Sequence, residues 1–210
     1  MNDDDNVMNG DAQGVRGLRE EIAAVAAALI AEDGLDYAAA KRKAFEHITG
    51  GHGSRRTNDV LPTNEQIERA VRDYQAIYQS DTQPQRLLAL RKKALALMQL
   101  IREFHPMVVG AVVNGTAGEH TDLHLHCFAD NAKSLGIFLL NQTIPNEAAP
   151  YPHVRPGQPD VEAIALQWQG ELAIIAVYPE HERRLSSSGK GHIERLGIEG
   201  LAQLIAQEGA

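Results

Sequence analysis

The chain has a single cysteine, Cys127, among its 210 residues. One cysteine excludes an intramolecular disulfide and any zinc site built from several thiolates. No apolar stretch approaches the roughly 20 residues that a membrane-spanning helix needs. The first residues, MNDDDN, are acidic, whereas a secretory signal begins with basic residues. We therefore expect a cytoplasmic protein of bacterial type without a membrane segment.

Aromatic residues make up only 5% of the chain, and its 20 lysines and arginines are outnumbered by 28 aspartates and glutamates, for a formal net charge of −8. Binding to bulk nucleic acid is not expected, because it depends on a basic surface that displaces counterions. The densest basic run, residues 41–43 (Lys-Arg-Lys), is either a solvated helix face or a contact for a phosphate or an acidic partner. The same two interpretations apply to Arg183, Arg184 and Lys190.

The whole chain is long and apolar enough for one α/β domain with a helical appendage. Helical periodicity dominates its first part. Residues 1–14 are polar and contain glycine, which predicts a disordered lead, and residues 50–62 read as a loop or linker. Thr63 and Gln66 fit a capping box at a helix start. Apolar spacings of three and four predict helices over residues 15–32, 37–48, 64–78 and 84–104.

We therefore expect a helical region over residues 15–80, which could contact a protein partner or a second copy of the chain. Strand patterns begin with an apolar run, Met107 to Val113, that ends at Asn114-Gly115. The later predicted elements are a helix from Asp130 through Leu140, a long Pro-rich loop, a hairpin and a last helix, over residues 130–140, 143–160, 161–178 and 198–207.

The predicted fold class is α+β, with an N-terminal helical region followed by a small mixed β-sheet flanked by helices over residues 81–210. The stretch from Val112 to Ala129, VVNGTAGEHTDLHLHCFA, carries the densest chemistry. Because strand side chains alternate with a period of two, one face of the central strand is apolar and the other is polar. The apolar face, with Leu123, Leu125 and Cys127, should enter the core. The polar face should carry a carboxylate and two imidazoles, those of Asp122, His124 and His126.

One strand ends in Gly115-Thr116, and after a short turn the chain continues with Thr-Asp-Leu-His-Leu at residues 121–125. This pattern resembles the signature of the DNA polymerase beta-type nucleotidyltransferase superfamily. The resemblance covers about residues 86–178. In that family a Gly-Ser turn holds the phosphates of a nucleotide triphosphate, an Asp-x-Asp pair on the next strand holds magnesium, and a later strand supplies a third carboxylate. The resemblance therefore implies a nucleotidyltransferase-like fold and metal-dependent transfer of a nucleotide to an acceptor hydroxyl.

Carried over to this chain, the resemblance assigns nucleotide binding to Gly115 and Thr116. It makes Asp122 and His124 the catalytic residues that hold the metal ion. His124 stands where the family has its second aspartate, and imidazole suits zinc or manganese better than magnesium. The implied cofactor is a divalent metal, magnesium or manganese, with zinc as the alternative.

The third carboxylate would come from the hairpin strands, at Glu162 or Glu171. The complete predicted metal-binding set is thus Asp122, His124, His126, Glu162 and Glu171. The missing second aspartate leaves two other interpretations open. One is a catalytically silent nucleotidyltransferase-like module with a regulatory or protein-interaction role. The other is a protein that binds a transition metal through its histidine face, with further ligands among His120, His153 and His181.

Overall fold

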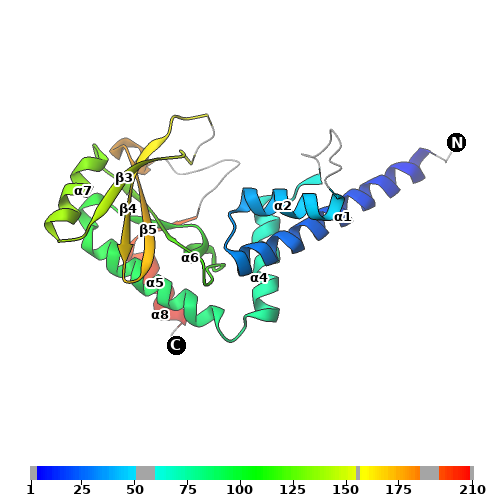
Figure 1. Cartoon of the computed structure of the whole chain (residues 1–210), viewed down its shortest axis with the longest axis horizontal. Helices are drawn as coiled ribbons and strands as arrows, with labels where there is room; N and C mark the ends of the chain where they lie inside the picture. Colours follow the sequence, from blue (N-terminus) through cyan, green and yellow to red (C-terminus); the bar gives the residue numbers. More distant parts are fainter. Residues whose placement is uncertain (1–3, 51–59, 155–156, 185–193, 209–210) are drawn as a thin grey trace. The chain divides into compact units, whose positions relative to one another are not determined.

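The computed structural model of the protein describes residues 4–50, 60–154, 157–184 and 194–208. The chain divides into two compact units (Figure 1). The first comprises residues 1–83 together with 118–120, and the second comprises residues 84–117 and 121–210. The predicted linker at residues 50–62 lies largely outside the described residues, and so does Lys190.

The first unit is helical, as predicted. Its described elements are α1 (Asp4–Asp33), α2 (Tyr37–Thr49) and α4 (Asn64–Tyr78). Its core joins Ile22 and Ala26 of α1 with Ala40 of α2 and Ile67 of α4, all with no exposed surface. The many alanines at this contact allow the helices to approach closely.

Two caps fix where helices of this unit begin. Asp36 Oδ1 accepts the backbone N–H groups of Ala38 and Ala39, both at 2.8 Å, at the start of α2. The capping box at α4 is confirmed, because Thr63 Oγ1 accepts the Gln66 N–H at 3.2 Å and Gln66 Oε1 accepts the Thr63 N–H at 2.9 Å. Helix α1 begins at Asp4 instead of Val15, so helical backbone covers residues 4–14, where we predicted disorder.

The second unit is a mixed sheet with helices, and the α+β fold class is confirmed. The strand order is β3-β4-β5-β2-β1-β6, with β2 parallel to β5 and the other pairs antiparallel. Its elements are α5 (Gln83–Leu100), η1 (Arg102–Phe104), β1 (Met107–Val109), α6 (Ala111–Asn114), β2 (Leu123–Phe128), α7 (Ala132–Asn141), β3 (Asn146–Tyr151), β4 (Val161–Trp168), β5 (Glu171–Tyr178), η2 (Glu180–Arg184), β6 (Arg195–Leu196) and α8 (Ile198–Glu208).

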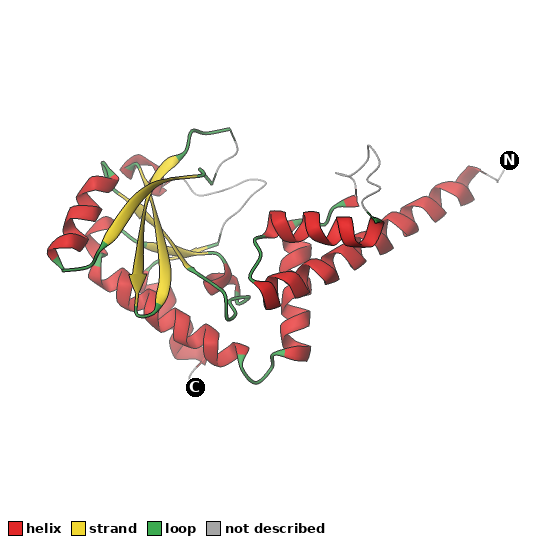
Figure 2. Ribbon diagram, in the orientation of Figure 1, coloured by secondary structure: helices red, strands yellow, loops and turns green. Residues whose placement is uncertain are grey.

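The main core of this unit lies between the sheet and α5, α7 and α8, which cover one of its faces (Figure 2). The sheet contributes side chains such as Leu125 of β2 and Ile175 of β5, and the helices contribute Leu97, Leu135 and Leu201. The opposite face carries a smaller cluster around Phe128, Ala176 and Tyr178. In the described part of the chain, no helix is long and apolar enough to cross a lipid bilayer.

Two predicted elements differ in the structure. The apolar run from Met107 to Val113 is not one strand, because the chain bends at Gly110 (φ +73°) into the single turn of α6. The Pro-rich segment is not wholly a loop, since it contains β3. Pro150 is tolerated there because β3 is an edge strand. The predicted hairpin is confirmed as β4 and β5, and positive φ angles at Gln169 and Gly170 match the twist of such a tight turn.

Candidate functional site

Strand β2 places its side chains as the alternation predicts. Leu123, Leu125 and Cys127 enter the core beneath the helices. Burial raises the pKa of the Cys127 thiol far above its ordinary value, so this sulfur is a packed apolar group and not a nucleophile. The chemistry of the strand therefore belongs to the opposite face, which carries His124 and His126.

His126 is enclosed on that face. Its side chain is 4% exposed, its Nδ1 has no hydrogen-bond partner among the described residues, and its ring lies 4.8 Å from the ring of Tyr178. Burial, aided by the positive charge of Arg195 and by His124 and His153, lowers the pKa of His126 to about 3. The imidazole is therefore neutral at pH 7.

His124 lies one row closer to the start of β2. Its Nδ1 is 3.3 Å from the hydroxyl of Tyr151 on β3. Burial lowers the pKa of His124, and the nearby carboxylate of Asp122 opposes this shift. Asp122 and His124 are therefore neighbours, as the sequence predicted, but the His124 imidazole is partly buried and has an aromatic partner in Tyr151.

His153 packs on the same Tyr178 ring as His126, whereas His181 and His120 lie elsewhere. His153 Nε2 is 3.6 Å from Glu182 Oε2, and its ring meets Tyr178 edge-on with 5.2 Å between centroids. His181 is exposed in η2. His120 is exposed, precedes β2 and is grouped with the first unit.

The two predicted glutamates lie on the face opposite to the histidines. Residues paired across neighbouring strands share a face. Glu162 pairs with Val177 and Val177 with Cys127, which places Glu162 on the Cys127 face. Glu171 is two residues before Ala173, the partner of Leu123, and so lies on the same helix-covered face.

Glu171 is also already neutralised by two cations. Its carboxylate accepts hydrogen bonds from Arg86 at 2.6 and 2.7 Å and from Lys93 Nζ at 2.6 Å. The Arg86 hydrogen bonds are the largest cause that lowers the pKa of Glu171 to about 2. The structure thus does not bring together the predicted set of Asp122, His124, His126, Glu162 and Glu171. Within the described ranges, no group of three or more His, Cys, Asp or Glu side chains is placed to hold a metal ion.

In the predicted phosphate-binding turn, the hydrogen-bond donors are used within the turn itself. Gly115 ends α6 in the left-handed region, at φ +86°. The backbone N–H of Thr116 donates to Asn114 Oδ1 at 3.0 Å, and the Thr116 hydroxyl donates to the same oxygen at 2.7 Å. Two donors that a phosphate would use therefore already have an acceptor within the turn.

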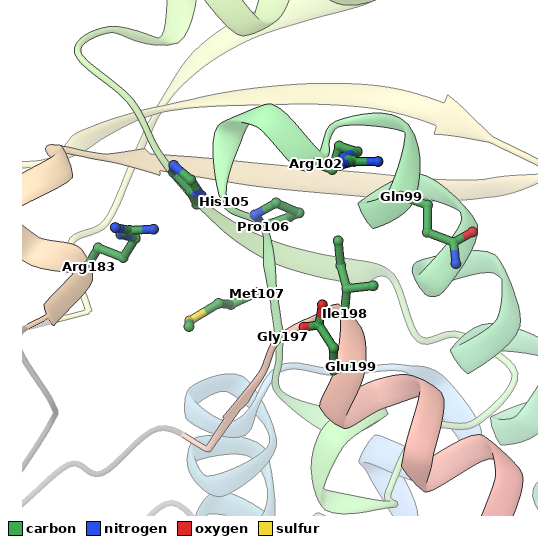
Figure 3. A pocket seen from close by; sticks show the side chains of 9 residues that line it. All are labelled: Gln99, Arg102, His105, Pro106, Met107, Arg183, Gly197, Ile198 and Glu199. Carbon is green, nitrogen blue, oxygen red and sulfur yellow. The ribbon is translucent and has the colours of Figure 1, made fainter.

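Sequence reasoning missed a pocket of about 680 Å³ at the start of β1 (Figure 3). It is surrounded by the ends of α5 and η1, by η2 and by the first turn of α8. Its basic lining residues are Arg102, His105 and Arg183, and Glu199 also lines it. The sequence offers one signal, the His105-Pro106 pair, which marks a break after a long helix, and His105 indeed takes a positive φ of 48°.

Comparisons with protein-family models, with curated proteins and with solved structures found no match to this chain.

Proposed function

We propose that the protein is a catalytically silent nucleotidyltransferase-like module, which acts by binding a partner and not by transferring a nucleotide. One observation carries the proposal. The strand pairing puts Glu162 and Glu171 on the opposite side of the sheet from His124, the imidazole that lies near the carboxylate of Asp122, so the carboxylates that metal-dependent transfer would need do not converge.

The neighbouring strands support the same conclusion. On β5, the residues that pair with His124 and His126 are Ile174 and Ala176, and those two pair on β4 with Ala165 and Ala163. None of these side chains can bind a metal ion. Two-metal catalysis of phosphoryl transfer depends on carboxylates that hold both ions against the phosphate oxygens, and here Asp122 is the carboxylate left for that role.

Thermal unfolding with ligands tests the proposal. The midpoint would be measured with magnesium, manganese or zinc, each with and without ATP, GTP, CTP and UTP. Native-state binding raises the midpoint with ligand occupancy, and we expect no nucleotide shift that requires a metal ion. Asp122→Ala is compared with Asp160→Ala, a matched variant at an exposed aspartate. A metal-dependent nucleotide shift that is lost in Asp122→Ala and kept in Asp160→Ala would instead establish an active site at Asp122.

We propose binding of a phosphorylated small molecule in the pocket of Figure 3 as a second candidate function. Arg102, His105 and Arg183 line this pocket, and guanidinium groups bind phosphates through paired, charge-assisted hydrogen bonds. Arg183 Nε also pairs with Glu180 at 2.8 Å, so Arg102 would make the larger contribution.

This binding would not depend on a metal ion, which separates it from nucleotide transfer. ATP or pyrophosphate in the presence of EDTA is expected to raise the unfolding midpoint of the wild type. The shift should be lost in Arg102→Ala and kept in Arg42→Ala, which removes an exposed arginine of α2. An equal shift in both variants would assign the effect to general anion binding.

A further inference from the structure

Helix α7 is apolar on two sides. Leu135 and Leu139 are fully buried against the sheet. On the outer side Ile137 is 48% exposed and Leu140 is 58% exposed, and in the described part of the second unit these are the large apolar side chains that remain exposed. A helix with apolar residues on its solvent side is typical of a surface that binds another molecule.

A groove of about 550 Å³ adjoins this side of α7. Phe104 of η1 and Phe128 at the end of β2 line it and are themselves buried, and Ile137 and Phe138 line its α7 side. The rings of Phe104 and Phe138 meet edge-to-face with 5.5 Å between centroids, which holds η1 against α7. The groove therefore has a fixed aromatic lining next to exposed aliphatic side chains.

The ionisable side chains that line the groove are mainly acidic. Glu103, Asp130 and Glu180 line it, together with His105. Glu180 is paired with Arg183. Glu103 and Asp130 are exposed, and in the described ranges of the chain no lysine or arginine forms an ion pair with either of them. Two carboxylates beside an apolar groove favour a partner that supplies both apolar side chains and positive charge.

We propose that this groove, with Ile137 and Leu140 beside it, binds an apolar segment of another protein that carries lysine or arginine. This inference rests on the binding role proposed above and names its partner. A second copy of the chain fits less well, because each copy carries a formal net charge of −8. Within the most basic run, Lys41 Nζ already donates to Asn64 Oδ1 at 2.7 Å and Lys43 already pairs with Asp33 at 3.6 Å.

Fluorescence polarisation with a labelled amphipathic peptide of leucine and lysine tests the inference on the full-length protein. We expect saturable binding that weakens about tenfold, equivalent to about 1.4 kcal/mol, in Ile137→Ser. A similar loss is expected in the double variant Glu103→Gln with Asp130→Gln. Two matched controls should bind as the wild type does: Ile77→Ser, at an isoleucine of α4 that is 70% exposed, and Glu46→Gln with Glu65→Gln, at exposed carboxylates of the first unit.

Methyl NMR of the wild type gives a second measurement that needs no variant. Titration with the peptide is expected to shift the methyl signals of Ile137 and Leu140 and to leave the signal of Ile77 in place. The inference is overturned if the wild type does not bind the peptide, or if groove and control variants lose affinity equally. Equal binding of a leucine–glutamate peptide would also overturn it, because charge would then play no part.

Association of the protein with itself is the remaining outcome. If light scattering shows a dimer that Ile137→Ser dissociates, the occupant is a second copy and the inference fails. These results are separate from the metal and nucleotide titrations. A metal-dependent nucleotide shift would overturn the silent-module proposal whatever the peptide does, whereas absence of peptide binding would leave the silent-module proposal standing.

Discussion

The guanidinium of Arg86 and the carboxylate of Glu171 form two parallel hydrogen bonds, from Nη1 to Oε1 at 2.6 Å and from Nη2 to Oε2 at 2.7 Å. Lys93, two turns further along α5, donates to the same Oε1 at 2.6 Å. Through these charge-assisted hydrogen bonds, Arg86 and Lys93 of α5 bind the first residue of β5. A carboxylate held in this way stabilises the fold and is not available as a metal ligand.

Replacing Glu171 by glutamine should lower the free energy of unfolding by about 1–2 kcal/mol at pH 7, because the charge-assisted hydrogen bonds are weakened and Arg86 loses its counter-charge. The matched variant Glu162→Gln, at an exposed carboxylate, should change it by less than about 0.5 kcal/mol. The pKa of Glu171 is lowered from 4.5 to about 2, so its contribution is complete above pH 4.5 and is lost as the pH falls toward 2. Urea unfolding of both variants at several pH values measures this difference.

Acid should destabilise the protein through His126. Its folded-state pKa of about 3 lies below the ordinary value of 6.5, so below pH 6.5 the unfolded chain takes up the proton first. The free energy of unfolding therefore decreases as the pH is lowered below 6.5, by up to about 1.4 kcal/mol per pH unit. The variant His126→Leu should show a smaller loss than the wild type in urea unfolding between pH 7 and 5, whereas His47→Leu, at an exposed site on α2, should not. Identical pH dependence in all three proteins would contradict the assignment.

Arg91 should be the most sensitive charged residue of the second unit. It is 3% exposed, donates from Nε to the Val112 carbonyl at 2.9 Å and from Nη2 to the Val113 carbonyl at 3.3 Å, and pairs with Glu208. Arg91→Leu leaves two carbonyl groups of α6 without these donors and should cost about 3 kcal/mol. Glu208→Gln, at the partly exposed partner, should cost under about 1 kcal/mol. Equal costs in chemical denaturation would show that the ion pair matters more than the carbonyl contacts.

Cys127 should not react in the folded protein. The thiol is fully buried and burial raises its pKa, so alkylation requires unfolding. Intact-mass measurement is expected to show modification by iodoacetamide in urea and almost none in native buffer. Alkylation at the same rate in both conditions would mean that β2 opens readily.

Local features of the fold were readable from the sequence. The helices followed from apolar spacing, the start of α4 followed from Thr63 and Gln66, and the hairpin followed from two apolar runs around Gln169-Gly170. Strand β3 was missed because Pro150 and its alanines give no strand signal, and an edge position makes them acceptable. The bend at Gly110 was missed because α6 depends on Arg91, about 20 residues earlier in the chain, whose donors meet its carbonyl groups.

The sequence predicted the candidate site only in part, because the face of the sheet on which a residue lies depends on the strand register. The alternation within β2 predicted correctly that Cys127 and His126 face opposite ways. The side on which Glu171 lies depends on the long-range pairing of His124 with Ile174, and a shift of one residue would reverse it. No local pattern specifies that register, and the cations that hold Glu171 lie 78 and 85 residues away along the chain.

The two edge strands of the sheet affect whether another chain can pair with it. One margin is β6, only two residues long, and the other is β3, which carries a proline and the charged Glu147. Short strands, prolines and charges at a sheet margin oppose the addition of a further strand from another chain. The sheet is thereby protected from pairing with extended peptides and from edge-to-edge aggregation. Among the described residues, the edges of the sheet therefore offer an added strand only the two residues of β6 and the proline-containing β3.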